Sequence, residues 1–421
     1  MKNILLQVRK SKMKESYDIA IIGGGASGLA AAVTAARRAD NISVAVFEKK
    51  DVTGKKLSAT GNGRCNISNI RCEGLEQVMD FFGSVGISVR KDEEGRFYPY
   101  GEDAGEVTSL LTACALNEGA EIFLNSEITG MEAKPGGGFL LFVGGKETGA
   151  AGKAGKRIEA KNVLLAAGGK SYASLGTTGD GYIMARKLGH SVGKLVPALT
   201  AVEVCEDLSA LKGVRSKAEA SLYKDGKMIF SERGEVQFRA DSLSGICIMN
   251  MSRFIRREYD YEIGINAVAD FGGDELLSII ESRFSIKGFN AEEALKTLVK
   301  RPLAELALRS AGIKPEEKAS AVLRGADGRQ RLDNLAGALQ DMRFEVKGLK
   351  GWNEAQVTAG GVSLAEVDPL TMESKIVPGL FFSGEVLDYD GPCGGYNLHH
   401  AWLTGIRAGK GMADRCIEFT R

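Results

Sequence analysis

The sequence of 421 residues predicts an α/β fold whose chain is interrupted by two inserted modules. The patterns follow one another in this order: a βαβ pattern, β-rich segments from about 196 to 269, helical periodicity from 273 to 342, and glycine turns with short strands from about 357. A chain of this length is too long to fold around a single hydrophobic core, so more than one domain is expected. We predict a flexible tail at residues 1–16 and an α/β domain made of residues 17–195 and 355–421. A β-rich module made of residues 196–271 and 343–354 and a helical module at 272–342 would interrupt that domain.

The composition is typical of a soluble globular protein, with 44% hydrophobic and 26% charged residues. Lys and Arg total 55 against 54 Asp and Glu, so no basic footprint for nucleic acid or a membrane is expected. The seven cysteines have no C-x-x-C spacing, which predicts no metal site and fits a reducing compartment. Residues 1–16 lack the apolar core of a signal peptide. We therefore expect a cytoplasmic protein whose partner is a small molecule, and the sequence does not indicate its oligomeric state.

The α/β prediction rests on the first three predicted elements, a strand, a helix and a second strand. Tyr17–Ile22 reads as a buried strand, a helix runs from about Gly25 to Ala39, and Ser43–Phe47 reads as the second strand. The turn between the strand and the helix has the spacing G-x-G-x-x-G. This arrangement is typical of a dinucleotide-binding unit.

Each glycine of that turn has a separate task. Gly23 makes the tight turn, Gly25 lets the backbone approach a pyrophosphate, and Gly28 lets the helix pack on the strand. The helix N-terminus then faces the phosphates. Glu48 stands twenty positions after Gly28, where a carboxylate accepts ribose hydroxyls and repels a 2′-phosphate.

The loop Gly54–Asn66 favours FAD over NAD. Its glycines let the backbone follow an extended cofactor, and Lys55, Lys56 and Arg64 can offset pyrophosphate charge. A solvated basic loop is the alternative interpretation. A later double glycine, Gly168-Gly169, follows a strand at Asn162–Ala167, without a second G-x-G-x-x-G. A separate dinucleotide domain for NAD(P)H is therefore not expected.

A further glycine-rich segment precedes the last predicted helix. A strand at Leu380–Ser383 delivers Gly384 and Glu385, and a glycine turn leads to a helix start near Asn397. The positive end of that helix would suit the N1/C2=O edge of a flavin. The candidate proton donors beside it are Tyr396, His399 and His400, for which packing and surface roles are equally compatible.

The inserted modules carry weaker signals. A hairpin is predicted around Lys224–Lys227, and Asn290 to Glu293 reads as a capping box. In the α/β domain, Asp180 is a plausible cap for a helix that ends at Leu188. Phe238–Met251 could present an apolar wall to a substrate or form an ordinary core strand. Arg239 and Asp241 could line a substrate cleft or form a surface ion pair.

Together these motifs resemble the BaiN/YhiN-like flavoproteins over nearly the whole chain from Tyr17. The resemblance implies a two-dinucleotide-binding-domain flavoprotein, in which a Rossmann-type FAD-binding domain is interrupted by a β-barrel-like module and a helical module. It also implies FAD contacts at the residues that match the family motifs: Gly23, Gly25, Ala26, Gly28, Glu48, Lys56, Arg64, Asn66, Gly168, Gly384, Glu385, Asn397 and Leu398, with the backbone of Ile128 meeting the adenine.

The resemblance implies an FAD-dependent oxidoreductase. Its best-matching activity is NAD(P)H-driven reduction of the C=C bond of an apolar enone, such as a 3-oxo-Δ4 or Δ4,6 bile acid or steroid intermediate of lipid metabolism. An amine oxidase of the aminoacetone type and a flavin-binding module without turnover are the alternatives. Arg239 stands where many relatives have threonine, and His399-His400 replaces an aromatic or Gln pair, so the substrate of any relative does not carry over directly.

Overall fold

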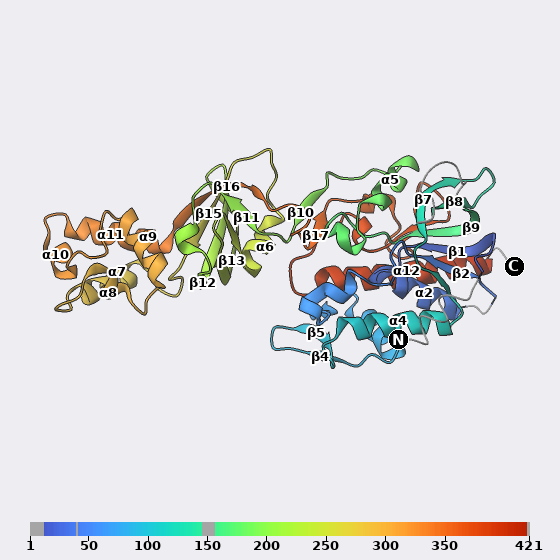
Figure 1. Cartoon of the computed structure of the whole chain (residues 1–421), viewed down its shortest axis with the longest axis horizontal. Coiled ribbons are helices and arrows are strands. Elements are labelled where there is room, and N and C mark those ends of the chain that lie inside the picture. The colour runs from blue at the N-terminus through green and yellow to red at the C-terminus, as the bar shows by residue number, and fades with distance from the viewer. Residues whose placement is uncertain (1–11, 39–40, 145–155, 419–421) are drawn as a thin grey trace. The chain divides into compact units, whose positions relative to one another are not determined.

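The structure is a computed structural model that describes residues 12–38, 41–144 and 156–418. The chain divides into two compact units (Figure 1). Unit 1 comprises Met1–Pro197 and Gln356–Arg421, and unit 2 comprises Ala198–Ala355. Of the predicted tail at residues 1–16, residues 1–11 lie outside the described residues.

Unit 1 is built on a parallel sheet. Its strands pair in the order β6-β2-β1-β9-β18. Their bounds are β1 Ser16–Ile22, β2 Val44–Phe47, β6 Glu121–Phe123, β9 Lys156–Leu165 and β18 Leu380–Phe382. The predicted βαβ strands are confirmed to within a residue. Because the strands are parallel, their carboxyl ends share one edge of the sheet, which is where such sheets bind ligands.

A meander extends the sheet beside β9. β7 (Glu127–Ala133) pairs antiparallel with β8 (Phe139–Gly144), and β8 pairs with the first half of β9. The second half of β9 pairs with β18 instead, at Val163–Leu165. The meander therefore leaves the carboxyl end of β9 next to β18.

Two helices pack side by side in unit 1, α2 (Ala26–Arg38) and α12 (Tyr396–Glu418) (Figure 1). Glycines in α12 allow the close approach. A Cβ on Gly405 would lie 2.4 Å from the Ser27 carbonyl oxygen, and one on Gly409 would lie 2.6 Å from the Ala31 carbonyl oxygen. The C-terminal helix therefore packs directly against the helix that follows the first strand.

The rest of unit 1 surrounds this core. β3, β5 and β4 form a small antiparallel sheet, and β10 pairs with β17. The bounds are α3 Leu75–Ser84, α4 Ala104–Asn117, α5 Asp180–Lys187, β3 Ser68–Asn69, β4 Val89–Lys91, β5 Arg96–Pro99, β10 Val196–Ala198 and β17 Val357–Ala359.

The predicted cap of α5 is wrong by one residue. Gly179, with a φ of 87°, is the N-cap, and Asp180 is the first helical residue. The Asp180 carboxylate accepts hydrogen bonds from Lys49 and, at 2.6 Å, from the Thr178 hydroxyl. The side chain is therefore used in a contact with the loop after β2, which a local pattern could not indicate.

Unit 2 contains a closed antiparallel barrel in the strand order β11-β14-β13-β12-β15-β16, within 198–355, all of which the structure describes. The strands are β11 Val202–Val204, β12 Arg215–Lys224, β13 Lys227–Phe238, β14 Ser242–Ser244, β15 Tyr261–Asn266 and β16 Met342–Leu349. The predicted hairpin is confirmed. Its two-residue turn, Asp225-Gly226, has φ of 49° and 77°, which matches the twist of the strands.

The segment Phe238–Met251 is not one strand. It contains β14 and then the helix α6 (Ile246–Ser252), separated by Gly245 with a φ of 105°. Leu243 and Ile248 lie fully buried in the barrel core, whereas Ile246 is 52% exposed. The apolar wall that the sequence suggested is therefore divided between a core and a surface.

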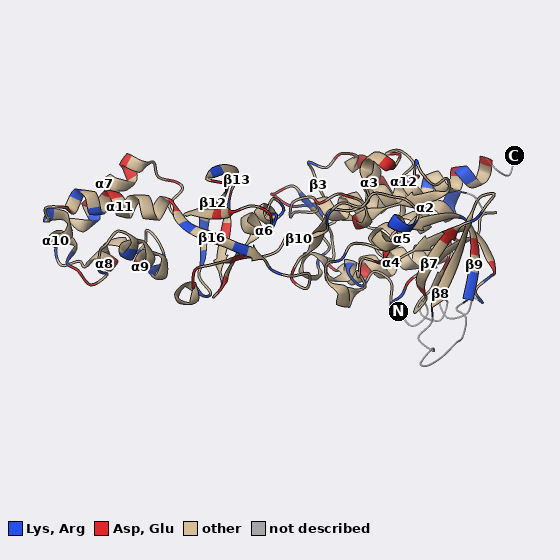
Figure 2. Cartoon of the chain, turned by 90° about the horizontal axis from the view of Figure 1, so that it is seen from above, with Lys and Arg blue, Asp and Glu red and all other residues tan. Residues whose placement is uncertain are grey.

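The helical module lies between β15 and β16. Its helices are α7 Gly273–Phe284, α8 Ala291–Leu295, α9 Arg301–Ser310, α10 Ala319–Arg324 and α11 Gly328–Gln340. The predicted capping box is confirmed, with the Glu293 amide donating to Asn290 at 2.8 Å and the Asn290 amide donating to Glu293 at 3.0 Å. Acidic and basic residues are interspersed along both units (Figure 2). Among the described residues, no helix combines the length and apolarity needed to cross a membrane.

Candidate dinucleotide and flavin site

The candidate site lies at the carboxyl edge of the parallel sheet. Gly23 follows β1, Glu48 follows β2, Ala166–Gly168 follows β9, and Ser383–Glu385 follows β18. These segments are far apart in the sequence. The strand order β2-β1-β9-β18 places them in a row along one edge, the usual position of an extended dinucleotide.

The glycine turn has the shape of a pyrophosphate cradle. Gly23 has a φ of 111°, and a Cβ there would lie 2.4 Å from the Ala166 carbonyl oxygen. A Cβ on Gly28 would lie 1.9 Å from the Gly23 carbonyl oxygen. A Cβ on Gly25, in contrast, would meet nothing within 4 Å. Open space thus lies in front of the α2 N-terminus, beginning at Ala26, and the residues present fit a dinucleotide there.

Glu48 is fixed beside this turn. Its carboxylate accepts the Gly24 amide at 2.9 Å through one oxygen and the Lys50 amide at 2.8 Å through the other. A carboxylate has about four lone-pair sites, so two remain for ribose hydroxyls. The geometry is compatible with the predicted ribose contact.

We expect Glu48→Ala to weaken FAD binding by about 1.5–3 kcal/mol, because a charge-assisted hydrogen bond is lost. Glu48→Gln keeps one oxygen acceptor and should cost less. Titration of the apoprotein with FAD measures both, with Glu132→Ala, an exposed carboxylate on β7, as the control. Equal affinity in all three variants and the parent would show that Glu48 is not a ribose ligand.

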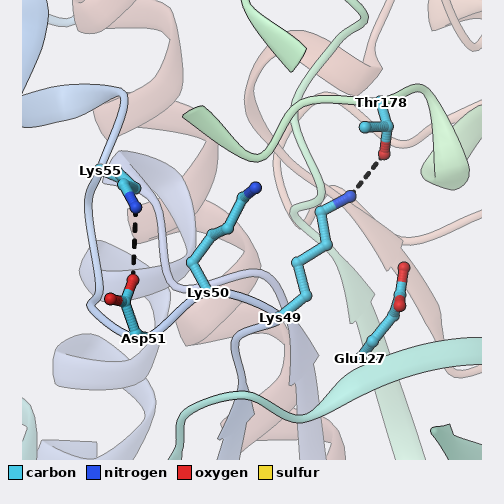
Figure 3. Close-up of a pocket in the computed structure, with 6 residues that line it drawn as sticks. All are labelled: Lys49, Lys50, Asp51, Lys55, Glu127 and Thr178. Carbon is cyan, nitrogen blue, oxygen red and sulfur yellow. Dashed lines mark hydrogen bonds and ion pairs between the residues drawn. The ribbon is translucent and has the colours of Figure 1, made fainter. Parts of the chain in front are cut away.

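A pocket of about 390 Å³ lies next to Glu48 (Figure 3). It is lined by Lys49, Lys50, Asp51, Lys55, Glu127 and Thr178. Lys55 forms an ion pair with Asp51 at 3.3 Å, so it is engaged locally. Ile128, whose backbone is predicted to meet the adenine, directly follows the pocket residue Glu127. The contact of Ile128 with the adenine stays a prediction.

Lys56 and Arg64, the two other basic residues of the loop, contact different parts of unit 1. Lys56 donates to Glu385 at 2.7 Å and to Ser171 at 2.9 Å. Arg64 is exposed, with its guanidinium 5.2 Å from the centre of the Tyr98 ring. Lys56 thus contacts the loops after β9 and β18, a placement that the sequence did not indicate.

Asparagine side chains hold the glycine turn before α12. The Asn66 amide, with its nitrogen toward the Ser68 carbonyl and its oxygen toward the Gly395 amide, bridges them at 3.1 Å each. Asn69 donates to the Gly394 carbonyl at 3.0 Å. Asn66 was predicted as an FAD contact, whereas Asn69 was missed, although it lies only three positions further along the same motif.

Asn397 holds the other end of the turn. Its amide group accepts from the Gly391 nitrogen and donates to the Gly391 oxygen, at 2.8 Å each. The first turn of α12, which includes Leu398, leaves backbone N–H groups without partners inside the helix. The N-termini of α2 and α12 therefore both supply a positive dipole end to this unit.

His399 has a structural environment. It is buried, and its Nε2 lies 2.8 Å from the Glu73 carbonyl oxygen. Because a carbonyl only accepts, Nε2 carries the hydrogen, and Nδ1 accepts from the Ser68 hydroxyl at 2.8 Å. Burial lowers the pKa of His399. With both nitrogens engaged, the ring anchors the start of α12.

His400 differs from its neighbour. Its ring stacks on Tyr389 with centroids 4.0 Å apart, and its Nε2 is buried with no hydrogen-bond partner among the described residues. Burial lowers the pKa of His400 to about 4. The ring is therefore neutral at pH 7. Tyr396, half-buried at the first position of α12, also belongs to this helix start.

Arg239 lies in unit 2, between β13 and β14. It is 43% exposed at its side chain and forms an ion pair with Glu354 at 2.6 Å. Arg239 thus forms a surface ion pair, but its partner is Glu354, and Asp241 pairs with Lys350 at 2.7 Å instead. A substrate carboxylate would have to displace Glu354 to reach Arg239.

The parallel sheet, the glycine cradle and the acid after β2 define a dinucleotide-binding protein of the Rossmann class. Residues 74–411 match the family model described as HI0933-like protein Rossmann domain, and residues 21–66 match the NAD(P)-binding Rossmann-like domain. The chain belongs to the HI0933-like family of FAD-binding Rossmann proteins and is a flavoprotein oxidoreductase. The resemblance noted in the sequence is confirmed at this level.

The chain is similar to named relatives over almost its full length. It is 32% identical to the 3-dehydro-bile acid delta(4,6)-reductase of Clostridium scindens, over 94% of this chain and 99% of the relative. It is 28% identical to the ribosomal RNA dihydrouridine synthase of Haemophilus influenzae, over 93% and 97%. Among solved structures, an open flavocytochrome c3 fumarate reductase is 17% identical, over 99% of this chain and 81% of that one, with a TM-score of 0.48.

Proposed function

We propose that this protein reduces a C=C bond conjugated to a carbonyl, in an apolar enone such as a 3-oxo-Δ4 or Δ4,6 bile acid or steroid. The supporting observation is the 32% identity to a bile acid delta(4,6)-reductase across nearly the whole of both chains. When bound, FAD would supply the hydride-transfer chemistry, with NAD(P)H as the source of the hydride and the β-carbon of the enone as its acceptor. NAD(P)H would use a transient groove, since the sequence holds no second G-x-G-x-x-G.

The residues of the chain would divide the remaining work. Gly25 and the α2 N-terminus would hold the pyrophosphate, and Glu48 the ribose. The α12 N-terminus would stabilise negative charge at the pyrimidine edge of the flavin. Addition of a hydride to the β-carbon leaves the α-carbon to be protonated. Of the three predicted donors we favour Tyr396, because both nitrogens of His399 are engaged in hydrogen bonds and His400 is neutral at pH 7.

A second candidate substrate is a uracil base in RNA. Two relatives that match over more than nine-tenths of this chain are named ribosomal RNA dihydrouridine synthases, at 28% and 26% identity. The uracil C5=C6 bond is also conjugated to a carbonyl, so the same hydride addition would apply. The balance of 55 Lys and Arg against 54 Asp and Glu favours the small enone, because RNA binding ordinarily uses a basic surface.

The test begins with the purified protein, which we expect to be yellow with close to one non-covalent FAD per chain. Under nitrogen, NADH or NADPH should bleach the flavin, and a 3-oxo-4-enoic or 4,6-dienoic bile acid should restore its colour within seconds. Arg239→Ala should slow this step at limiting substrate if Arg239 meets the bile acid carboxylate.

Other outcomes would point elsewhere. Re-oxidation by uridine-containing RNA and not by bile acids would favour the RNA substrate. Bleaching by amines with re-oxidation by O2 would favour the oxidase. A flavin that responds to none of these would indicate a binding module without turnover, and release of FMN or failure to load any flavin would overturn the proposal altogether.

A further inference from the structure

Lys56 takes part in a partly buried ion pair on the edge of the sheet. Its Nζ lies 2.7 Å from Glu385 Oε2 and 2.9 Å from Ser171 Oγ. The side chains of Lys56 and Glu385 are only 22% and 19% exposed. Lys56 comes from the loop after β2, Ser171 from the loop after β9, and Glu385 from the turn after β18. The ammonium group is therefore fixed where three loops meet.

The carboxylate of this pair is held on its other side as well. Glu385 Oε1 accepts the Thr358 amide at 2.8 Å and the Ser171 hydroxyl at 3.2 Å. A Cβ on Gly169 would lie 2.5 Å from that same oxygen and 2.4 Å from Thr358 Oγ1. The cluster is thus tightly packed, and a glycine at 169 is required for it. Such packing distinguishes it from a flexible surface ion pair.

The strand order indicates which part of the cofactor this cluster faces. Glu48 follows β2 and the cradle follows β1, whereas Ser171 and Glu385 follow β9 and β18. Neighbouring strands are about 4.8 Å apart, so the ends of β2 and β18 are separated by roughly 14 Å. A dinucleotide with its ribose at Glu48 and its phosphates at Gly25 continues toward β9 and β18. Lys56 therefore lies on the flavin half of the site.

An ammonium group has three N–H donors. Glu385 and Ser171 use two of those of Lys56. We propose that Lys56 directs its remaining N–H toward the flavin half of FAD and stabilises the reduced, negatively charged flavin, while Glu385 positions the ammonium and moderates its charge. This inference rests on the proposed function only in requiring bound FAD, and it names a redox-tuning pair where the sequence suggested a pyrophosphate counter-charge.

The test is the midpoint potential of the FAD-loaded protein, measured against a reference dye. Lys56→Met should lower the affinity for reduced relative to oxidised FAD about tenfold, which lowers the two-electron potential by about 30 mV. Lys56→Arg should restore most of it. Glu385→Gln removes the opposing negative charge and should shift the potential upward. Lys410→Met, an exposed lysine on α12, should leave it unchanged.

Opposite shifts in Lys56→Met and Glu385→Gln support the proposal, because a merely structural pair would weaken FAD binding in both without opposing effects on potential. Unchanged potentials, or shifts of the same sign, would overturn it. If Lys56→Met binds no FAD, Glu385→Gln decides alone, since an upward shift supports the assignment and no shift contradicts it. Failure of the unaltered protein to bind FAD would instead overturn the proposed function.

Discussion

Gly25→Val is expected to weaken FAD binding at least fivefold while leaving the stability of the apoprotein nearly unchanged. A Cβ at this position meets nothing within 4 Å, so the folded chain has room for the side chain. The same room is the space in front of α2 that a pyrophosphate would fill. Overpacking costs about 1–3 kcal/mol, which would lower FAD affinity by roughly five- to 150-fold before the lost amide contacts are counted.

Gly28→Val provides the matched control. A Cβ on Gly28 would lie 1.9 Å from the Gly23 carbonyl oxygen, so this variant should lose stability even without cofactor. Thermal unfolding of the apoprotein and FAD titration together separate the two effects. Normal FAD binding by Gly25→Val would show that the cofactor does not approach this turn.

Acidification is expected to destabilise the protein through His400. Burial lowers the pKa of His400 to about 4, against about 6.5 in the unfolded chain. At pH values between these two pKa values, His400 is protonated in the unfolded chain and neutral in the folded protein. The stabilisation is therefore complete above about pH 6.5 and is lost as the pH falls to about 4. At about 1.4 kcal/mol per pKa unit, the loss is roughly 3 kcal/mol.

His400→Gln should remove that part of the pH dependence. The measurement is urea unfolding of the variant and the parent protein at pH 7 and pH 4.5. Burial also lowers the pKa of His190 and His399, so the parent and the variant share a background slope, and the difference between them isolates His400. Identical slopes would mean that the His400 ring becomes protonated in the folded state.

Local patterns predicted the elements that short-range physics determines. The strand Tyr17–Ile22, the hairpin turn Asp225-Gly226 and the capping box at Asn290 all depend on residues within a few positions of one another. The cradle glycines also belong here, because their spacing alone indicates a turn between a strand and a helix.

The sequence could not predict contacts that only the folded sheet brings together. Lys56 and Glu385 are 329 positions apart, and no local signal links them. For His399 the sequence showed a titratable ring near a helix start. Its partners Ser68, in β3, and Glu73, in the turn before α3, are 331 and 326 positions away. Asn69 follows the recognised loop Gly54–Asn66 by three positions, but its partner, the Gly394 carbonyl, is 325 positions away, so no local signal indicated this contact.

The discontinuity of unit 1 sets an order of events during synthesis. Unit 2 is one continuous stretch, Ala198–Ala355, and can fold once that stretch has left the ribosome. Unit 1 cannot complete its sheet before β18 is made, and its last helix, α12, begins only at Tyr396. The predicted cofactor contacts include Gly384, Glu385 and Asn397, so on this prediction FAD has no complete binding surface until translation is almost finished. A chain truncated shortly before its end would therefore carry a finished barrel and an unloadable flavin domain.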